Sequence, residues 1–382
     1  MKAIGIIAEY NPFHNGHLHH LTKIKELYPE HTIVLVISGN FTQRGDVSII
    51  DKWKKTEIAK NLGIDLVVEL PFPFATQSAD YFSYGAITIL EYLQVEKFIF
   101  GSESNNIEDL EAIADAQLYN EDFDKLVKIY SKLGNNYPTA LSLALKDLTG
   151  KIVTTPNDLL GISYIKTIKK NNYKIKAETL KRTASYHDES LLEHSSATAI
   201  RKALKENIDV KDYIPDVVYK SLTNLHFIED YFPLLKYKIL TEDDLSKYQT
   251  VDEGLDQLLK KHIQSATTYE ELVNKLKSKR YTHNKITRML LHILCNFTKD
   301  KAKQFQNINY IRLLGFNEQG RKYLSNIKKM VPVPIISKIN REKDLMLEYE
   351  ISTTKIYSLT ESHKNQIELV EKEYRNLMKK EN

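Results

Sequence analysis

The first 200 residues alternate short, continuous apolar runs with amphipathic stretches, and this rhythm limits the possible folds more than any other feature. Four runs have the character of buried strands, Ala3–Ala8, Thr32–Ile37, Leu66–Leu70 and Lys97–Phe100, and Lys174–Leu180 is a candidate fifth. Buried strands separated by helices are typical of a parallel sheet with right-handed crossovers. We therefore predict an α/β fold that begins with a Rossmann-like parallel-sheet domain.

Helical patterns fill the intervals between these runs. We predict helices at His17–Leu27, Asp51–Leu62 and Ala79–Leu93, because apolar residues recur there at helical spacing. Two further helical stretches, Tyr137–Leu148 and Asn157–Lys169, interrupt the rhythm before the fifth run. We interpret them as an insertion beside the last strand.

The pattern changes near residue 195, after which helical stretches dominate. We predict successive helices and two strand-like segments there, followed by two more helices: Ser196–Leu204, Asp212–Asn224, Phe227–Leu240, Leu255–Ile263, Tyr269–Lys277, Asn284–Phe297, then strand-like Ile308–Leu314 and Val331–Ile336, then helical Arg341–Tyr357 and Thr360–Lys379. Pro332 and Pro334 keep the second strand-like segment out of a sheet centre, since proline lacks a ladder donor. The predicted boundary falls at 195–210 and divides the chain into residues 1–200 and a mostly α-helical C-terminal region, residues 201–382.

Charge is distributed unevenly between these two regions. Residues 201–382 carry 33 Lys and Arg against 25 Asp and Glu, whereas residues 1–200 carry 21 against 25. The C-terminal region is therefore basic, with a net charge of +8, and the N-terminal region is mildly acidic, at −4. An excess of this kind indicates either a surface that binds polyanions or an ordinary solvated face.

Composition and the chain start indicate a soluble protein of the cytoplasm. Hydrophobic residues make up 42% and charged residues 27%, which is a globular composition. The apolar run before Glu9 is too short for a signal-peptide core, and no stretch reaches the roughly 18 apolar residues of a membrane span. The single cysteine, Cys295, lies in an apolar run and is expected to be buried. We expect no membrane association and see no sign of an obligatory protein partner.

The strongest chemical signal lies where the first predicted strand ends. Ala3–Ala8 runs into the loop at 9–14 and then into Asn15-Gly16-His17, where a helix begins. Ligands of open α/β sheets bind at the carboxyl ends of strands, and a helix N-terminus attracts anions. Gly16 allows a close backbone approach, so His14 and His17 can both face a phosphate and stabilise charge during displacement at phosphorus.

Other interpretations of the histidines remain open. Four of the 12 histidines, His14, His17, His19 and His20, lie within seven residues. A metal site would need further ligands, and no nearby cysteine or carboxylate completes a set. His19 fits a helix surface, and His20 fits either a surface or a site. We predict no protein-bound metal.

Two motifs together resemble the HxGH nucleotidyltransferase superfamily. His14-Asn15-Gly16-His17 matches its signature, and the segment from Ser195 to Arg201 resembles its second motif, a Ser/Thr-rich helix start followed by arginine. Hydroxyls at a helix N-terminus bind phosphate oxygens, and a guanidinium adds a bidentate partner. An ordinary helix cap is the alternative explanation of Ser196.

Seven further segments resemble the bacterial tRNA(Met) cytidine acetate ligase family over the full length of the chain, with Lys279–Leu291 (KRYTHNKITRMLL) as a C-terminal marker. They are GIIAEYNPFHNGHL at 5–18, SGNFTQRG at 38–45, DLVVELP at 65–71, SADYFSYG at 78–85, FGSE at 100–103, PNDLLG at 156–161 and KRTASYHD at 181–188. The resemblance implies that ATP activates acetate as acetyl-adenylate, with release of diphosphate. The acetyl group would then pass to N4 of the wobble cytidine of elongator tRNA(Met), giving N4-acetylcytidine.

The resemblance also implies which residues bind ATP and which act on it. His14 and His17 are the predicted catalytic residues, and Mg²⁺ is expected to accompany ATP. Residues 1–200 would form the catalytic domain and residues 201–382 the tRNA-binding region. The predicted ATP-binding residues are Ile7, Ala8, Glu9, Tyr10, Asn11, Pro12, Phe13, His14, Asn15, Gly16, His17, Leu18, His19, His20, Gly101, Asn157, Arg182, Ser196 and Arg201.

Local sequence supports several of these positions but leaves some roles open. Gly101 follows a predicted strand, and Asn157 follows Pro156 at a helix start, where it could equally be a cap. Tyr10 and Phe13 could shield the adenine base or belong to the core.

Two further segments are candidates for the acyl and amine sites. The loop at 38–45 could form a pocket for a two-carbon acid and present Asn40 or Arg44, or it could be a polar surface loop. Asp80 is a candidate general base for the cytidine amine and is equally a helix cap.

A dense basic segment marks the C-terminal region. Seven basic or histidine side chains lie within residues 275–288, with Tyr281 among them as a possible ring for stacking on a base. A solvated pair of helices is the alternative explanation. The predicted tRNA-binding residues are Lys275, Lys279, Arg280, Lys285 and Arg288.

Two other functions are compatible with parts of this pattern. A nucleotidyltransferase acting on a small phosphorylated metabolite would explain the phosphate motifs but not the basic helical region. A non-catalytic RNA-binding protein would explain the basic region but not an intact HxGH motif. An ATP-dependent acetate ligase acting on tRNA accounts for both.

Overall fold

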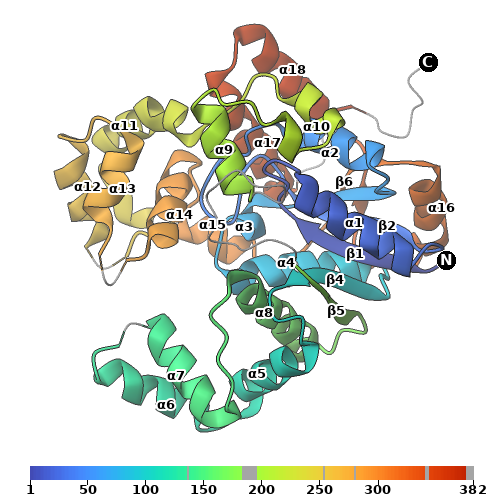
Figure 1. Ribbon diagram of the computed structural model, residues 1–382. Helices are drawn as coiled ribbons and strands as arrows, with labels where there is room; N and C mark the ends of the chain where they lie inside the picture. Colours follow the sequence, from blue (N-terminus) through green and yellow to red (C-terminus); the bar gives the residue numbers. More distant parts are fainter. Residues whose placement is uncertain (136, 183–195, 253, 279–280, 340–343, 376–382) are drawn as a thin grey trace.

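The computed structural model describes residues 1–135, 137–182, 196–252, 254–278, 281–339 and 344–375. Seven strands form one sheet in the order β5-β4-β1-β2-β3-β6-β7 (Figure 1). The first five are parallel to one another, as the apolar runs predicted. Their bounds are β1 Ala3–Ala8, β2 Thr32–Ser38, β3 Leu66–Leu70, β4 Lys97–Ser102 and β5 Lys176–Lys181.

Helices cover both faces of this sheet, because the central strands bury residues on alternating sides. In β2, Ile33, Leu35 and Ile37 pack in one apolar cluster, and Val34 and Val36 pack in the other. The first cluster lies under α1 (Asn15–Leu27), α2 (Lys52–Asn61), α9 (Ala197–Lys205) and α10 (Asp216–Ser221). The second lies under α4 (Ala79–Tyr92), α5 (Ile107–Tyr119), α8 (Pro156–Lys170) and the C-terminal helices. The α/β fold is therefore confirmed.

The helices up to residue 205 agree closely with the apolar periodicity, although it did not reveal α3, α5 or α6. α6 and α7 form a hairpin that projects away from the sheet, at the lower left of Figure 1. The bounds are α1 Asn15–Leu27, α2 Lys52–Asn61, α3 Phe72–Ala75, α4 Ala79–Tyr92, α5 Ile107–Tyr119, α6 Phe123–Lys132, α7 Tyr137–Thr149, α8 Pro156–Lys170 and α9 Ala197–Lys205.

The region after residue 205 is mostly helical, as predicted. Short 3₁₀ turns at Lys211–Tyr213, Ile228–Tyr231, Leu245–Lys247 and Ser358–Thr360 join the helices. The helices are α10 Asp216–Ser221, α11 Phe232–Thr241, α12 Leu255–Ile263, α13 Tyr269–Leu276, α14 His283–Leu294, α15 Lys299–Gln304, α16 Glu318–Ile327, α17 Leu345–Tyr357 and α18 His363–Glu373.

The C-terminal region also contributes to the sheet. β6, Ile311–Phe316, pairs antiparallel with β3, and β7, Ile335–Ile336, pairs with β6 at the edge. Both strands were expected from their apolar runs, and the edge position of β7 suits the prolines that precede it. The sheet thus takes strands from both sides of the predicted boundary at 195–210, which stays a prediction.

Helix α2 presents two buried lysines to the ends of the central strands. Asp51 caps this helix by accepting from the N–H groups of Trp53 and Lys54. The Lys55 ammonium lies 3.0 Å from Glu9 O, 2.7 Å from Ser38 O and 2.7 Å from Gly39 O. It therefore connects the ends of β1 and β2, and burial lowers the pKa of Lys55 to about 7.

We predict that Lys55→Met lowers the free energy of unfolding by about 2–4 kcal/mol, because three buried carbonyls lose their donor. A urea titration followed by circular dichroism measures this change. Lys60→Met is the matched control on the same helix, since Lys60 pairs only with the exposed Glu57 among the contacts described. Equal stability of the two variants would contradict this role of Lys55.

Candidate functional site

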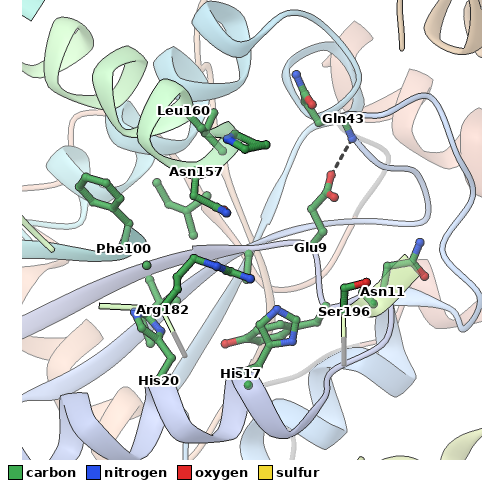
Figure 2. Close-up of a pocket in the computed structure, with 18 of the residues that line it drawn as sticks. Glu9, Asn11, His17, His20, Gln43, Phe100, Asn157, Leu160, Arg182 and Ser196 are labelled. Atoms are coloured by element: carbon green, nitrogen blue, oxygen red, sulfur yellow. Dashed lines mark hydrogen bonds between the residues drawn. The ribbon is translucent and has the colours of Figure 1, made fainter. Parts of the chain in front are cut away.

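A cavity of about 670 Å³ opens at the carboxyl ends of β1, β4 and β5. The N-termini of α1, α8 and α9 border it, and the loop at 42–44 and Asn284 of α14 complete its rim. Its volume suits a nucleotide-sized ligand. Figure 2 shows that side chains from widely separated segments converge on this space.

The two predicted catalytic histidines lie at the N-terminus of α1, where His14 is the N-cap residue and His17 lies in the first turn. Their rings stack with centroids 3.7 Å apart, and both line the cavity. Gly16 N–H donates to Nδ1 of His14 at 3.1 Å, and His14 N–H donates to Nδ1 of His17 at 3.3 Å. Because each Nδ1 accepts a hydrogen bond, each ring is left to donate to a ligand through Nε2.

Tyr10 and Phe13 support the His17 ring from the core. Their ring centroids lie 4.9 and 5.5 Å from that of His17, and both side chains are buried in the apolar cluster under α1. Of the two interpretations left open for them, core packing fits better, although Tyr10 also reaches the cavity wall. Their packing fixes the orientation of the imidazole.

Asn11 and Arg201 hold the loop in place. The Asn11 side chain donates to Val47 O and accepts from Ile49 N–H, and it is buried. Arg201 donates to Asn11 O at 2.8 Å and lies 3.6 Å from Asp46. Both residues line the cavity, yet much of their bonding capacity serves the loop itself.

Burial and positive neighbours keep His17 and His20 of α1 neutral. Desolvation, followed by the charges of His14 and Arg182, holds the pKa of His17 well below its usual value. Desolvation and Arg182 lower the pKa of His20 to about 4. A group of neutral donors beside a guanidinium is suited to receiving an anion.

The β4 and β5 side of the cavity brings together three other predicted residues. Arg182 packs over Gly101, where an added Cβ would lie 3.1 Å from the arginine Cγ. Asn157, at the start of α8, donates to Glu103 at 2.6 Å, and both Asn157 and Arg182 line the cavity. Ser196 caps α9 by accepting a hydrogen bond from Ala199 N–H, and it also lines the cavity.

Sequence reasoning missed the apolar wall of the cavity. Phe82, Phe100, Leu160 and Tyr164 line it, and Figure 2 shows Leu160 beside Asn157. Asn157, Leu160 and Tyr164 follow helical spacing along α8, a signal that could have placed them on one face. Phe100 lies within β4, and Phe82 depends on the packing of α4, which no local pattern reveals.

The loop at 38–45 divides between the cavity and the core. Thr42, Gln43 and Arg44 line the cavity. Asn40 is buried and instead bonds to Lys52 N–H and Thr354 Oγ1, so its proposed contact with a small acid is wrong. The Gln43 N–H donates to the Glu9 carboxylate at 2.7 Å, the contact dashed in Figure 2.

Most residues of the predicted ATP site surround this one cavity. Pro12, Phe13, Asn15 and Leu18 do not line it; Phe13 lies in the core and Asn15 bonds to Asp212 O. Those that do line it are Ile7, Ala8, Glu9, Tyr10, Asn11, His14, Gly16, His17, His19, His20, Gly101, Asn157, Arg182, Ser196 and Arg201.

The basic segment borders the cavity rim through α14. Arg288 approaches Gln43 O at 3.5 Å, and Lys285 lies over the ring of Tyr281. Tyr281 is only 8% exposed, so its interpretation as a ring for stacking is wrong. Lys275 pairs with Glu271 on α13. Lys279 and Arg280 lie outside the described residues.

Among the described residues there is neither a ready metal-binding cluster nor a membrane-spanning helix. In that part of the chain, no group of three or more His, Cys, Asp or Glu side chains is placed to hold a metal ion. None of the described helices combines the length and apolarity needed to cross a bilayer.

Comparison with known proteins gives full-length matches. A family model described as HIGH Nucleotidyl Transferase matches residues 1–372. A protein of Geobacillus sp. (strain WCH70) is 40% identical over 362 residues, 90% of each chain, and one of Caldicellulosiruptor saccharolyticus is 42% identical over 378 residues, 94% of each. Both relatives are named tRNA(Met) cytidine acetate ligase.

Solved structures agree with this result. Apo Thermotoga maritima TmcAL superposes with a TM-score of 0.89 at 32% identity, over 96% of both chains. The same protein bound to α-thio ATP gives a TM-score of 0.86 at 30% identity, also over 96% of both chains.

The neutral state of His17 predicts a proton uptake on nucleotide binding. A polyphosphate beside the ring favours its charged form, so its pKa rises in the complex. ATP affinity should therefore increase as the pH is lowered, and more protons should be taken up by the wild type than by His17→Gln. Calorimetry at pH 6 in buffers of different ionisation enthalpy measures this difference. Equal uptake by both proteins would refute the coupling, since titration of ATP itself is common to both.

Proposed function

The chain belongs to the tRNA(Met) cytidine acetate ligase family of HIGH nucleotidyltransferases, and we propose that it uses ATP to acetylate tRNA. Acetate would be activated as acetyl-adenylate with release of diphosphate. The acetyl group would then pass to N4 of the wobble cytidine of elongator tRNA(Met), in the cytoplasm. This reaction makes the protein a ligase that forms a carbon–nitrogen bond at the expense of ATP.

The observation that carries this proposal is the stacked pair His14 and His17 at the N-terminus of α1, inside a nucleotide-sized cavity. Both rings can donate through Nε2, because each Nδ1 accepts a backbone N–H, and the helix end adds a partial positive charge. Such an arrangement supports stabilisation of charge that develops on the α-phosphate. Full-length similarity to the ligases supports acetate as the nucleophile.

The first step would need positioning and charge stabilisation but no proton transfer. A carboxylate oxygen of acetate attacks the α-phosphorus, the bond to the bridging oxygen breaks, and diphosphate leaves. His14 and His17 would donate to the α-phosphate oxygens, and Arg182 and Arg201 would neutralise the phosphates. Mg²⁺ would enter bound to ATP, and phosphate oxygens and water would hold it, since no group of three or more described His, Cys, Asp or Glu side chains could bind a metal ion.

The other residues that line the cavity lie where the proposed reaction would need them. Asn157 and the bare backbone of Gly101 border the side where the nucleoside would lie, together with the apolar wall at Phe100 and Leu160. Thr42 and Arg44 border the opposite rim, next to α14. We propose that residues 201–382, with their excess of positive charge, present the tRNA from that side.

We predict that His14→Asn and His17→Gln each lower acetate-dependent exchange of diphosphate into ATP by about 100-fold or more. Asparagine and glutamine keep the hydrogen bonds of the helix cap, so the loss reports on the imidazole and not on the fold. His363→Gln, an exposed change on α18, is the control. Wild-type exchange in both variants would remove these residues from the mechanism.

The same assay tests the whole proposal with the wild-type protein. Exchange that depends on acetate would demonstrate reversible formation of the adenylate. If acetate has no effect even when unmodified tRNA(Met) is added, and a phosphorylated metabolite supports exchange instead, a metabolite nucleotidyltransferase is the better description.

We predict that the triple change Lys279→Ala, Arg280→Ala, Lys285→Ala weakens tRNA(Met) binding and flattens its salt dependence. Each lost phosphate contact reduces the slope of log affinity against log salt by about 0.7–0.9. Filter binding at several salt concentrations measures both quantities. Lys322→Ala is the control, because Lys322 lies on α16, far from α14 in Figure 1, and pairs with Glu318. Equal slopes would place the RNA surface elsewhere.

A further inference from the structure

A carboxylate stands in a cavity that otherwise favours anions. Of the described residues that line it, only Glu9 carries a carboxylate, whereas His17, Arg182 and Arg201 provide donors and positive charge. A carboxylate beside a triphosphate is repulsive unless it faces a different ligand. Its presence therefore points to a positive group or an N–H donor close to the phosphates.

The surroundings of Glu9, which lines the cavity, fix one of its carboxylate oxygens. Oε1 accepts the Gln43 N–H at 2.7 Å, and the main-chain oxygen accepts from Lys55. In the described part of the chain, no hydrogen bond or ion pair reaches Oε2. The group is thus held in one orientation, with one acceptor available.

Glu9 also lies on the side of the cavity that adjoins the basic segment. Its side chain points toward Gln43 and away from Arg182 and His20 in Figure 2. Arg288 of α14 approaches the Gln43 carbonyl. Thr287 of the same helix donates a hydrogen bond to the carbonyl of the next residue, Arg44. An RNA base that enters over this rim would meet Glu9 before it meets the phosphate-binding residues.

We propose that Glu9 is the general base for the acetyl transfer, accepting a proton from the N4 amine of the cytidine. This inference rests on the proposed function. The cytidine amine is weakly nucleophilic because its lone pair is delocalised into the ring, so it must lose a proton as it attacks. The nitrogen–carbon bond forms, the bond between the acetyl carbon and the phosphate oxygen breaks, AMP leaves, and the proton moves to Oε2 of Glu9 and then to water.

The structure favours Glu9 over Asp80, the candidate base suggested by the sequence. Asp80 is exposed, lies 3.2 Å from Lys166 and does not line the cavity, although its neighbour Ala79 does. Its carboxylate therefore serves the surface of α4 and α8. Asp80→Asn is for this reason the matched control for a loss of carboxylate charge.

The test separates the two half-reactions. Acetate-dependent diphosphate exchange reports on the adenylate, and single-turnover acetylation of unmodified tRNA(Met) reports on the transfer. We expect Glu9→Gln to lower the ratio of transfer rate to exchange rate by about 100-fold or more. Glu9→Asp should recover part of that ratio, and Asp80→Asn should leave it near the wild-type value.

Other outcomes would overturn the inference in distinguishable ways. A wild-type ratio in Glu9→Gln, with a wild-type enzyme active in both assays, refutes the role of Glu9 and leaves the proposed function intact. A deficit that disappears when Mg²⁺ is raised would assign Glu9 to the metal and not to the amine. A wild-type enzyme inactive in both assays would refute the proposed function first.

Discussion

The buried ammonium group of Lys55 sets the relative positions of the loops on which the site depends. It lies within hydrogen-bonding distance of Glu9 O at the end of β1, of Ser38 O and Gly39 O at the end of β2, and of Ser48 Oγ. These oxygens belong to two loops, and without the shared donor each loop would be held independently of the other. Because Glu9 begins the loop at 9–14 and Gly39 lies in the loop at 38–45, the Lys55 side chain holds two segments that line the cavity.

A second lysine on the same helix connects the sheet to the C-terminal helices. Lys52 lies 2.8 Å from Glu69 on β3 and 2.7 Å from Glu373 on α18, and Arg312 on β6 also reaches Glu373. All four side chains are buried, so removing one charge would leave its partners uncompensated in a medium of low dielectric. This network joins segments about 300 residues apart and explains how the C-terminal region completes the sheet.

The cavity itself divides into parts of different chemistry. His17, His20 and Arg182 lie near the N-terminus of α1, where we propose that the triphosphate binds, and an apolar wall from α4 and α8 completes the cavity. Glu9 occupies the third side, toward the basic helix α14. In the proposed reaction, separating the anion-binding side from Glu9, the one carboxylate among the described lining residues, lets one cavity serve an anionic co-substrate and an amine acceptor, since each charge is placed near a ligand of opposite character.

The sequence by itself determined the local features: the parallel strands β1–β5, most of the helices up to residue 205 and the loop at 9–14 before α1, because continuous apolar runs and short motifs encode them within a few residues. Only the tertiary structure decided that Asn40 turns into the core, that Tyr281 is buried and that Glu9 rather than Asp80 faces the cavity. It also decided that β6 returns to pair antiparallel with β3. These outcomes depend on which distant side chain fills each space in the core. Packing between segments far apart in the chain leaves no periodic pattern in the sequence of either segment.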